Sequence, residues 1–215
     1  MPIDIPLRCR CDSVRGMALA LAPDHGTHGI CYCDDCQAFF HYLARDEMLD
    51  AHGGSDIFQL TPAQLRIDAG AEHIRCVRLS DKGMFRWFAS CCRTPIANTM
   101  GAARLPFAGM LLCFVDPDVD QATRESAFGK PIAFAFGRYA RGGAPPNVPA
   151  GVPIRWALRT VRKLARGFVL GQHRPSPFFD EHGAPVVQPT VLTPAQRSAL
   201  TPATTTRMDG KHAGL

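Results

Sequence analysis

Three cysteines within six residues, in the segment Cys31-Tyr-Cys-Asp-Asp-Cys36, constrain this chain more than any other feature of its sequence. A turn that carries three thiols can present them to one metal ion, and zinc takes thiolate sulfur at about 2.3 Å in a tetrahedral set. Three protein ligands leave one coordination position open, as a catalytic zinc requires. The alternative, a redox-active Cys-x-x-Cys pair, usually follows a strand in a βαβ unit, and the sequence around these cysteines lacks that pattern. The spacing therefore predicts zinc bound by Cys31, Cys33 and Cys36.

A second group of cysteines is spread along the first half of the chain. Cys9 and Cys11 form a Cys-x-Cys pair that supplies two ligands and needs two more from far along the sequence. Cys92 is the natural supplier, and the adjacent Cys91 is the less favoured one. A structural zinc bound in this way would tie the N-terminus to the middle of the domain and contribute on the order of 10 kcal/mol to folding.

Composition and the start of the sequence indicate the class of protein. The 215 residues are 46% hydrophobic and 20% charged, which is globular, and eighteen prolines and nineteen glycines predict a modest helix content. No apolar run reaches the length of about 18 residues that a membrane-spanning helix needs. The first residues have no basic region and no apolar region of a secretory signal, so we expect a cytoplasmic protein. Reducing conditions there favour metal or thiol chemistry for clustered cysteines. Cys76 and Cys113, which stand alone in apolar text, are interpreted as buried small hydrophobic residues.

Short apolar runs separated by glycine and proline fill the first half and predict a mainly β domain over residues 1–127. Residues 37–49 fit either a helix or an irregular loop, residues 61–64 fit one capped turn, and residues 118–128 fit a short helix. The candidate strands are 14–21, 64–67, 74–79, 84–88 and 111–115.

The sequence composition changes after residue 128, and residues 128–200 are predicted to form a proline-rich and helical extension that packs on the first domain. An amphipathic helix is predicted over 153–170, with a short helix start at Thr193. The helix carries an apolar stripe, which we expect to pack on the domain, formed by Ile154, Leu158, Val161 and Phe168. The polar residues 201–215 are predicted to be a disordered tail.

Positive charge is concentrated in the extension. No acidic residue occurs between Glu125 and Asp180, and nine basic residues do. A basic amphipathic helix can contact anionic lipid, nucleic acid or an acidic partner, but most such helices only show their charges to solvent. The nine are Lys130, Arg138, Arg141, Arg155, Arg159, Arg162, Lys163, Arg166 and Arg174.

Three blocks of this sequence resemble a known family. Residues 7–16 (Leu-Arg-Cys-Arg-Cys-Asp-Ser-Val-Arg-Gly), residues 31–37 (Cys-Tyr-Cys-Asp-Asp-Cys-Gln) and residues 88–96 (Phe-Ala-Ser-Cys-Cys-Arg-Thr-Pro-Ile) come in the order of three motifs of the glutathione-dependent formaldehyde-activating enzymes, a family that includes centromere protein V. The motifs are Cys-x-Cys-Gly-x-Val, Cys-His-Cys-x-x-Cys-Arg and Phe-Cys-x-x-Cys-Gly-x-Pro-Leu. The resemblance covers roughly residues 7–115.

The resemblance implies a fold of antiparallel sheets around zinc, sometimes called a β-tent. It implies a structural zinc site with Cys9, Cys11 and Cys92 as ligands. It also implies a second zinc with a free position at the Cys31, Cys33 and Cys36 group.

This sequence departs from the motifs at several positions. Ala89 stands where the family has a cysteine and Cys91 lies beside Cys92 instead, which leaves the structural site one ligand short of the motif. The remaining departures are Asp12 and Arg93 in place of glycines, Tyr32 in place of a histidine and Gln37 in place of an arginine.

The resemblance implies carbon–sulfur lyase chemistry, in which a thiol such as glutathione and an aldehyde are joined or separated, with zinc as Lewis acid and template. His41 is a candidate general acid or base, or an additional ligand, although a hydrogen-bonded surface histidine is the commoner outcome. The alternative function is a non-catalytic, zinc-stapled binding module whose basic segment 138–174 engages an acidic partner. A nucleic-acid partner is not expected, and the oligomeric state stays open. Water or a thiol in the fourth position of the Cys31 group favours the enzyme, and a fourth protein ligand favours the module.

Overall fold

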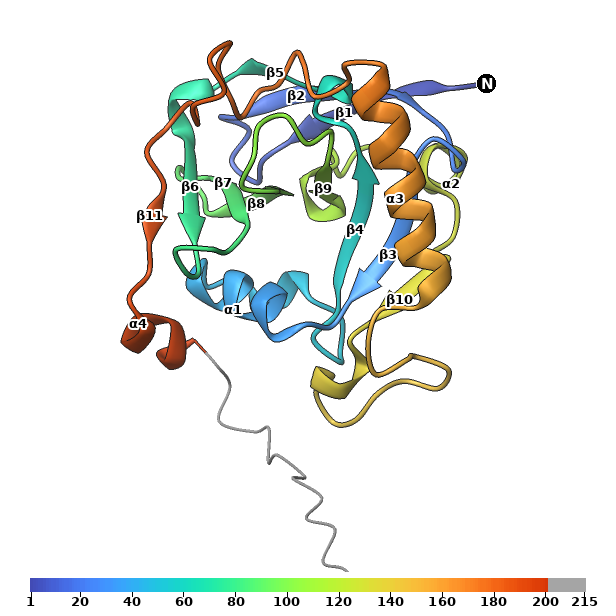
Figure 1. Cartoon of the computed structure of the whole chain (residues 1–215), viewed down its shortest axis with the longest axis vertical. Helices are drawn as coiled ribbons and strands as arrows, with labels where there is room; N and C mark the ends of the chain where they lie inside the picture. The colour runs from blue at the N-terminus through green and yellow to red at the C-terminus, as the bar shows by residue number, and fades with distance from the viewer. Residues whose placement is uncertain (201–215) are drawn as a thin grey trace, which may run out of the picture.

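Two β-sheets frame the protein, and the computed structural model describes residues 1–200 (Figure 1). The smaller sheet has the antiparallel strand order β1-β2-β5. The larger sheet has the order β10-β3-β4-β9-β8-β7-β6-β11, with parallel pairing only where β10 meets β3 and β11 meets β6 among the described strands. The prediction of a mainly β fold is confirmed. The predicted tail, 201–215, lies outside the described residues.

The strands are short, as the spacing of glycine and proline predicts. In the smaller sheet they are β1 (Ile3–Arg8), β2 (Arg15–Leu21) and β5 (Leu65–Ala69). In the larger sheet they are β3 (Thr27–Cys31), β4 (Ser55–Leu60), β6 (Ile74–Arg78), β7 (Phe85–Ala89), β8 (Thr94–Thr99), β9 (Ala108–Leu111), β10 (Ala133–Ala135) and β11 (Thr190–Val191).

The main core lies between the two sheets. It includes Ile5 and Leu7 on β1 and Trp87 on β7. Gly16 has a specific role, because a Cβ there would clash with the carbonyl oxygen of Arg66, so glycine lets β2 and β5 pair closely. A second cluster packs helix α1 against the larger sheet through residues such as Phe39 and Leu111.

The helices are α1 (Asp34–Tyr42), α2 (Gln121–Phe128), α3 (Ile154–Val169) and α4 (Pro194–Ala199). None of these four helices is both long enough and apolar enough to cross a membrane. Single 3-10 turns lie at Asp46–Met48, Pro62–Gln64, Ala71–His73, Leu112–Phe114 and Gly137–Tyr139. The predicted strand at 111–115 is wrong in extent, because β9 ends at Leu111 and a 3-10 turn follows it.

The extension contributes to the larger sheet at both of its edges. β10 pairs with β3, and β11 pairs with β6, so residues far apart in sequence lie side by side (Figure 1). Helix α3, which comes between β10 and β11 in the sequence, lies over the part of the sheet that contains β3 and β4 (Figure 1).

The predicted packing of α3 is wrong in orientation. Ile154 is 75% exposed and Phe168 is 60% exposed, and Leu158 and Val161 are exposed as well, so the apolar stripe faces solvent. The buried residues of the helix are Trp156 and Gly167.

Candidate metal centres

The three-cysteine group forms where β3 passes into α1. Cys31 is the last residue of the strand, Cys33 is the N-cap of the helix and Cys36 lies in its first turn. The sulfur atom of Cys33 accepts a hydrogen bond from the backbone N–H of Cys36 at 3.3 Å, a role that serine or aspartate oxygen usually takes at a helix start. The three sulfurs all lie within 4.8 Å of one another, and the group contains no further Cys, His, Asp or Glu among residues 1–200. The geometry thus brings together the three residues that the spacing selects.

The surroundings of this group favour negative charge on sulfur. The N-terminus of a helix carries a partial positive charge, which stabilises thiolates. The guanidinium of Arg86 on β7 is almost fully buried, and its Nη1 atom lies 3.9 Å from Cys36 Sγ. Hydrogen bonds with Cys31 and Cys33, and the charge of Arg86, hold the pKa of Cys36 well below its ordinary value. The same shared hydrogen bonds, together with burial, raise the pKa of Cys31. Negative charge is therefore most favoured at Cys36, and a bound cation would favour it at the other two sulfurs.

Two arginines neutralise the carboxylates beside the group. Asp34 and Asp35 follow Cys33 directly, and Arg86 Nη2 lies 3.7 Å from an oxygen of Asp35. Arg197, on α4 at the far end of the described chain, donates to Asp34 at 3.2 Å and to Asp35 at 2.8 Å. The sequence predicts the start of α4 but carries no signal that places it here, so this neighbour is missed without the structure.

Gln37 and Tyr32 have structural contacts at the positions where they differ from the motif. The amide nitrogen of Gln37 donates to the carbonyl oxygens of Tyr32 at 2.8 Å and of Tyr139 at 2.9 Å. The hydroxyl of Tyr32 donates to Asp50 at 3.1 Å. These bonds fix the backbone between Cys31 and Cys33 against the extension.

His41 lies at the end of α1 and is engaged on both ring nitrogens. Nδ1 lies 2.8 Å from an oxygen of Asp46, and Nε2 lies 2.9 Å from Nη2 of Arg141. The ring therefore donates to the carboxylate and accepts from the guanidinium. His41 does not belong to the three-cysteine group. Its role as acid or base stays a prediction.

The four-cysteine group joins two turns that are distant in sequence. Cys9 and Cys11 lie in the turn between β1 and β2, and Cys91 and Cys92 lie in the turn between β7 and β8. All four sulfurs lie within 4.8 Å of one another. The structure thus brings in Cys91, which the sequence ranks below Cys92, while Ala89 is fully buried on β7.

The sulfur separations fit a tetrahedral metal ion. Sulfurs at about 2.3 Å from one zinc ion in tetrahedral geometry lie about 3.8 Å apart. The distances are 3.6 Å between Cys9 and Cys11, 3.7 Å between Cys9 and Cys91, and 3.9 Å between Cys91 and Cys92. A disulfide needs sulfurs at about 2.05 Å, so these distances fit ligands of one ion instead.

The backbone around this group is left-handed at two positions. Asp12 has φ of 65° and Arg93 has φ of 57°, a region that glycine adopts more easily than other residues. Each follows directly after a cysteine of the group, Cys11 or Cys92. Both turns therefore have a left-handed residue directly after a sulfur ligand.

Charge in the four-cysteine group also depends on nearby polar groups. The hydroxyl of Ser13 lies 3.3 Å from Cys11 Sγ, and this hydrogen bond, with that of the Ser13 backbone, lowers the pKa of Cys11 to about 6. Burial raises the pKa of Cys9. Arg45 donates to the carbonyl oxygen of Cys92 at 2.6 Å, which anchors the second turn to the residues after α1.

Comparison with known proteins gives a family without an assigned activity. A crystal structure of a Rhodobacter sphaeroides protein is similar to this chain, with 14% sequence identity and a TM-score of 0.39, over 55% of this chain and 93% of that one. No curated protein matches the chain. The family model described as a family of unknown function, DUF6151, matches residues 1–189, a span that includes both cysteine groups and most of the extension. The chain therefore belongs to the DUF6151 family.

Proposed function

We propose that the three-cysteine group is an open zinc site and that the protein is a carbon–sulfur lyase acting on an adduct of a thiol and an aldehyde. The observation that carries the zinc site is the convergence of Cys31, Cys33 and Cys36 without a fourth Cys, His, Asp or Glu in the group among the described residues. Thiolate sets of this kind select zinc and other borderline or soft metals. Zinc bound there would supply a Lewis acid with room for a substrate atom.

The resemblance to the glutathione-dependent formaldehyde-activating enzymes supports the reaction class, and two structural observations agree with it. Asp12 and Arg93, which replace glycines of the motifs, keep the left-handed backbone that glycine favours. Cys91 joins Cys9, Cys11 and Cys92, so a fourth sulfur is present although Ala89 replaces the motif cysteine. The four-cysteine group is then the structural zinc site of this proposal.

The reaction needs a sulfur nucleophile and a place for one proton. When a thiol and an aldehyde join, a bond forms between sulfur and the carbonyl carbon, and the carbonyl oxygen gains the proton that the thiol loses. In the reverse direction the same bond breaks and the proton returns to sulfur. On the protein side, Cys31, Cys33 and Cys36 would hold the metal, and the positive charge of Arg86 favours thiolate at Cys33 and Cys36. His41 stays the candidate for carrying the proton.

Metal analysis tests the two sites separately. The wild type should contain two zinc ions per chain, Cys33→Ser should contain one, and Cys9→Ser should also lose one and lose much more stability. Cys113→Ser is the matched control, because Cys113 belongs to neither group. A folded, reduced wild type that carries no metal at the three-cysteine group, after growth with zinc, would overturn the proposal.

Activity is tested with glutathione and formaldehyde as the first substrate pair. Proton NMR exchange between the free aldehyde and its glutathione adduct should accelerate with wild-type protein and not with Cys33→Ser at equal concentration. If the zinc-loaded wild type leaves the exchange rate unchanged with glutathione and with other small thiols, the lyase assignment fails while the metal sites stand.

The binding-module alternative predicts a different fourth ligand for the metal at the three-cysteine group. In that case the fourth ligand of the three-cysteine group comes from the protein, and an added thiol does not change the metal spectrum of a cobalt-substituted sample. The enzyme proposal expects a change in that spectrum. The cytoplasmic location, which the free cysteines of the described structure suit, remains a proposal that fractionation of cells would test.

A further inference from the structure

The outer face of α3 is apolar and exposed. At 3.6 residues per turn, its exposed apolar side chains occupy an arc of about 120° on the helix surface. Their exposure is well above that of core residues, with Val169 at 83% and Leu158 at 63%. The arc is formed by Ile154, Ala157, Leu158, Val161, Ala165, Phe168 and Val169.

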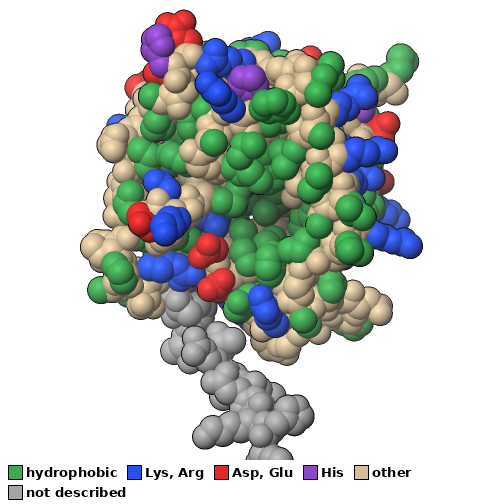
Figure 2. Space-filling model, viewed as in Figure 1, with side chains coloured by type: hydrophobic (Ala, Val, Ile, Leu, Met, Phe, Trp, Pro, Cys, Tyr) green, Lys and Arg blue, Asp and Glu red, His purple; other side chains and the backbone are tan. Residues whose placement is uncertain are grey.

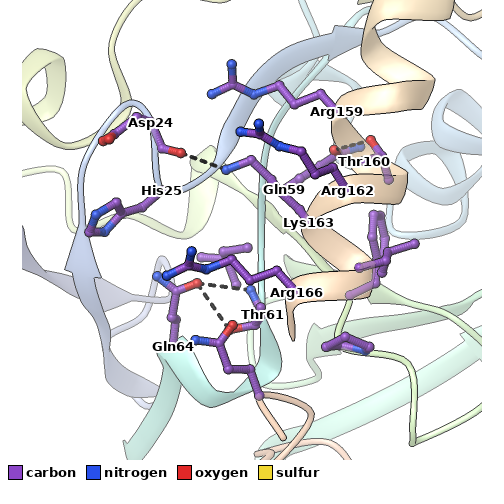
Figure 3. A pocket seen from close by; sticks show the side chains of 15 residues that line it. Asp24, His25, Gln59, Thr61, Gln64, Arg159, Thr160, Arg162, Lys163 and Arg166 are labelled. Atoms are coloured by element: carbon purple, nitrogen blue, oxygen red, sulfur yellow. Dashed lines mark hydrogen bonds between the residues drawn. The ribbon is translucent and has the colours of Figure 1, made fainter. Parts of the chain in front are cut away.

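Polar contacts on the opposite side fix the helix in this orientation (Figure 3). Lys163 donates to the carbonyl oxygen of Asp24 at 2.8 Å, and Arg159 donates to that of Gly26 at 3.1 Å. The hydroxyl of Thr160 donates to the side chain of Gln59 at 2.9 Å. The bonds from Lys163 and Arg159 satisfy carbonyl groups of the turn between β2 and β3, and the bond from Thr160 reaches β4.

Packing adds to these polar contacts. Trp156 is buried against Gly29, and a Cβ at Gly167 would lie only 2.9 Å from Pro106. No rotation of α3 keeps both sets of contacts and hides the apolar arc, so the exposure is built into the fold.

A band of arginine adjoins the apolar arc. Arg162, Arg155 and Arg166 follow it within about 60° on the same side of the helix and are exposed. Figure 2 shows basic side chains along the right-hand edge of the molecule, where α3 lies in Figure 1, next to hydrophobic ones.

A cavity of about 760 Å³ continues this band between α3 and the turn that precedes β3. Four basic residues of the helix line it, and Asp24 is the one acidic residue in its lining. Burial, and the charge of Arg159 after it, lowers the pKa of Lys163 to about 8. Crowded cations of this kind favour an anion among them. The four are Arg159, Arg162, Lys163 and Arg166.

We propose that α3 docks the protein on the surface of an anionic lipid bilayer. The apolar arc enters the boundary between headgroups and acyl chains, and the arginine band and the cation-lined cavity receive phosphate and carboxylate groups of the lipids. Helices that lie in a membrane interface combine this wide apolar face, basic residues beside it and low overall hydrophobicity. The contact is along the surface and involves no crossing of the bilayer.

Charge favours lipid over a second copy of the chain. An antiparallel two-fold pair of α3 helices through their apolar faces would place the arginine bands of both copies on the same side, next to each other. Residues 126–179 contain no acidic side chain that could compensate them. An anionic bilayer offers both the apolar depth and the negative charge.

Vesicle sedimentation with the full-length, metal-loaded protein tests the proposal. Wild type should bind vesicles made of equal amounts of phosphatidylcholine and phosphatidylserine, bind pure phosphatidylcholine at least about tenfold more weakly, and release from the mixed vesicles as salt rises. The double variant Leu158→Ser/Phe168→Ser should lose binding by about tenfold or more. Because both side chains are exposed, its thermal midpoint should stay near that of the wild type.

Two triple variants of equal net charge distinguish binding through α3 from general electrostatic attraction of the protein to the vesicle. Arg155→Gln/Arg162→Gln/Arg166→Gln should weaken binding by about tenfold or more, whereas Arg15→Gln/Arg66→Gln/Lys82→Gln, with the same net charge, should change it by about twofold at most. Equal weakening in both triple variants, or unaltered binding in Leu158→Ser/Phe168→Ser, would refute the docking surface. So would a wild-type dimer in sedimentation velocity that the serine double variant dissociates, because the face would then be covered by a second copy.

Discussion

His28 on β3 donates to Asp56 on the neighbouring strand β4, with 2.7 Å between Nε2 of the ring and Oδ1 of the carboxylate. The other ring nitrogen, Nδ1, lies 2.7 Å from the carbonyl oxygen of Gly129, at the end of α2. Both partners are acceptors, so both nitrogens donate and the ring is the imidazolium form. Burial alone would lower the pKa of His28, but the hydrogen bond and charge of Asp56 outweigh it, and the pKa is raised above its ordinary value of 6.5.

Stability should therefore fall as pH rises through the raised pKa of His28. The group binds its proton more tightly in the folded state, so its contribution is complete below the unfolded-state pKa and disappears above the folded-state pKa. Urea unfolding of wild type and His28→Gln, between about pH 6 and 9, measures this contribution as the difference between them. The difference should shrink with increasing pH. A difference that stays constant across this range would show that folding does not change the pKa of His28.

Replacing Arg86 should weaken both the fold and the three-cysteine site. Its buried guanidinium also lies 3.3 Å from the side-chain oxygen of Asn98, so Arg86→Met should lower the free energy of unfolding by about 2 kcal/mol. Metal affinity, measured by competition with a chelator, should fall by about tenfold, as it does when other groups that contact the metal ligands are replaced. Arg75→Met on the exposed side of β6 is the control and should retain wild-type affinity. Equal affinities in both variants would remove Arg86 from the metal site.

Two substitutions in α3 should differ sharply in their effect on stability. Trp156 is 9% exposed, so Trp156→Ala should lower the free energy of unfolding by about 3 kcal/mol. Ile154→Ala, on the exposed apolar arc, should change it by about 0.5 kcal/mol at most. Chemical denaturation followed by circular dichroism measures both. The reverse ranking would mean that α3 packs through its apolar face.

Glycine should be accepted at the left-handed position after Cys92. Arg93 is exposed with φ of 57°, so Arg93→Gly should raise the free energy of unfolding by up to about 1 kcal/mol, while Arg93→Val should lower it. Calorimetry of the two metal-loaded variants provides the measurement. If both substitutions destabilise equally, the arginine side chain and not the backbone matters at this turn.

Local signals in the sequence predict several elements well. The run at 14–21 becomes β2, the run at 74–79 becomes β6, and the capped turn at 61–64 forms with both reciprocal hydrogen-bond partners of a capping box. The strands β10 and β11 are not predicted, because strands of two or three residues at a sheet edge carry almost no periodicity. Their existence depends on pairing with β3 and β6, which is a long-range relationship.

The difference between local signals and long-range contacts also decides what the sequence predicts about α3 and about the cysteines. The apolar stripe correctly predicts the helix, yet it does not predict its orientation, because the carbonyl groups that bind Arg159 and Lys163 lie in a distant turn. Spacing identifies the cysteine groups because ligands of one ion must be close. The contribution of Cys91 is underestimated, since its approach to Cys9 is a contact between two turns that are far apart in sequence.

The two cysteine groups also differ in when they can form during synthesis. Cys31 to Cys36 leave the ribosome almost together, and their sulfurs can meet as soon as the first turn of α1 forms. Cys9 and Cys11 must wait until Cys91 and Cys92 have been translated, roughly eighty residues later. At about 5–20 residues per second that delay lasts several seconds, during which the first pair is exposed as free thiols on a nascent chain. The pair at the N-terminus thus lacks its partner ligands for longer than any cysteine of the Cys31–Cys36 group does.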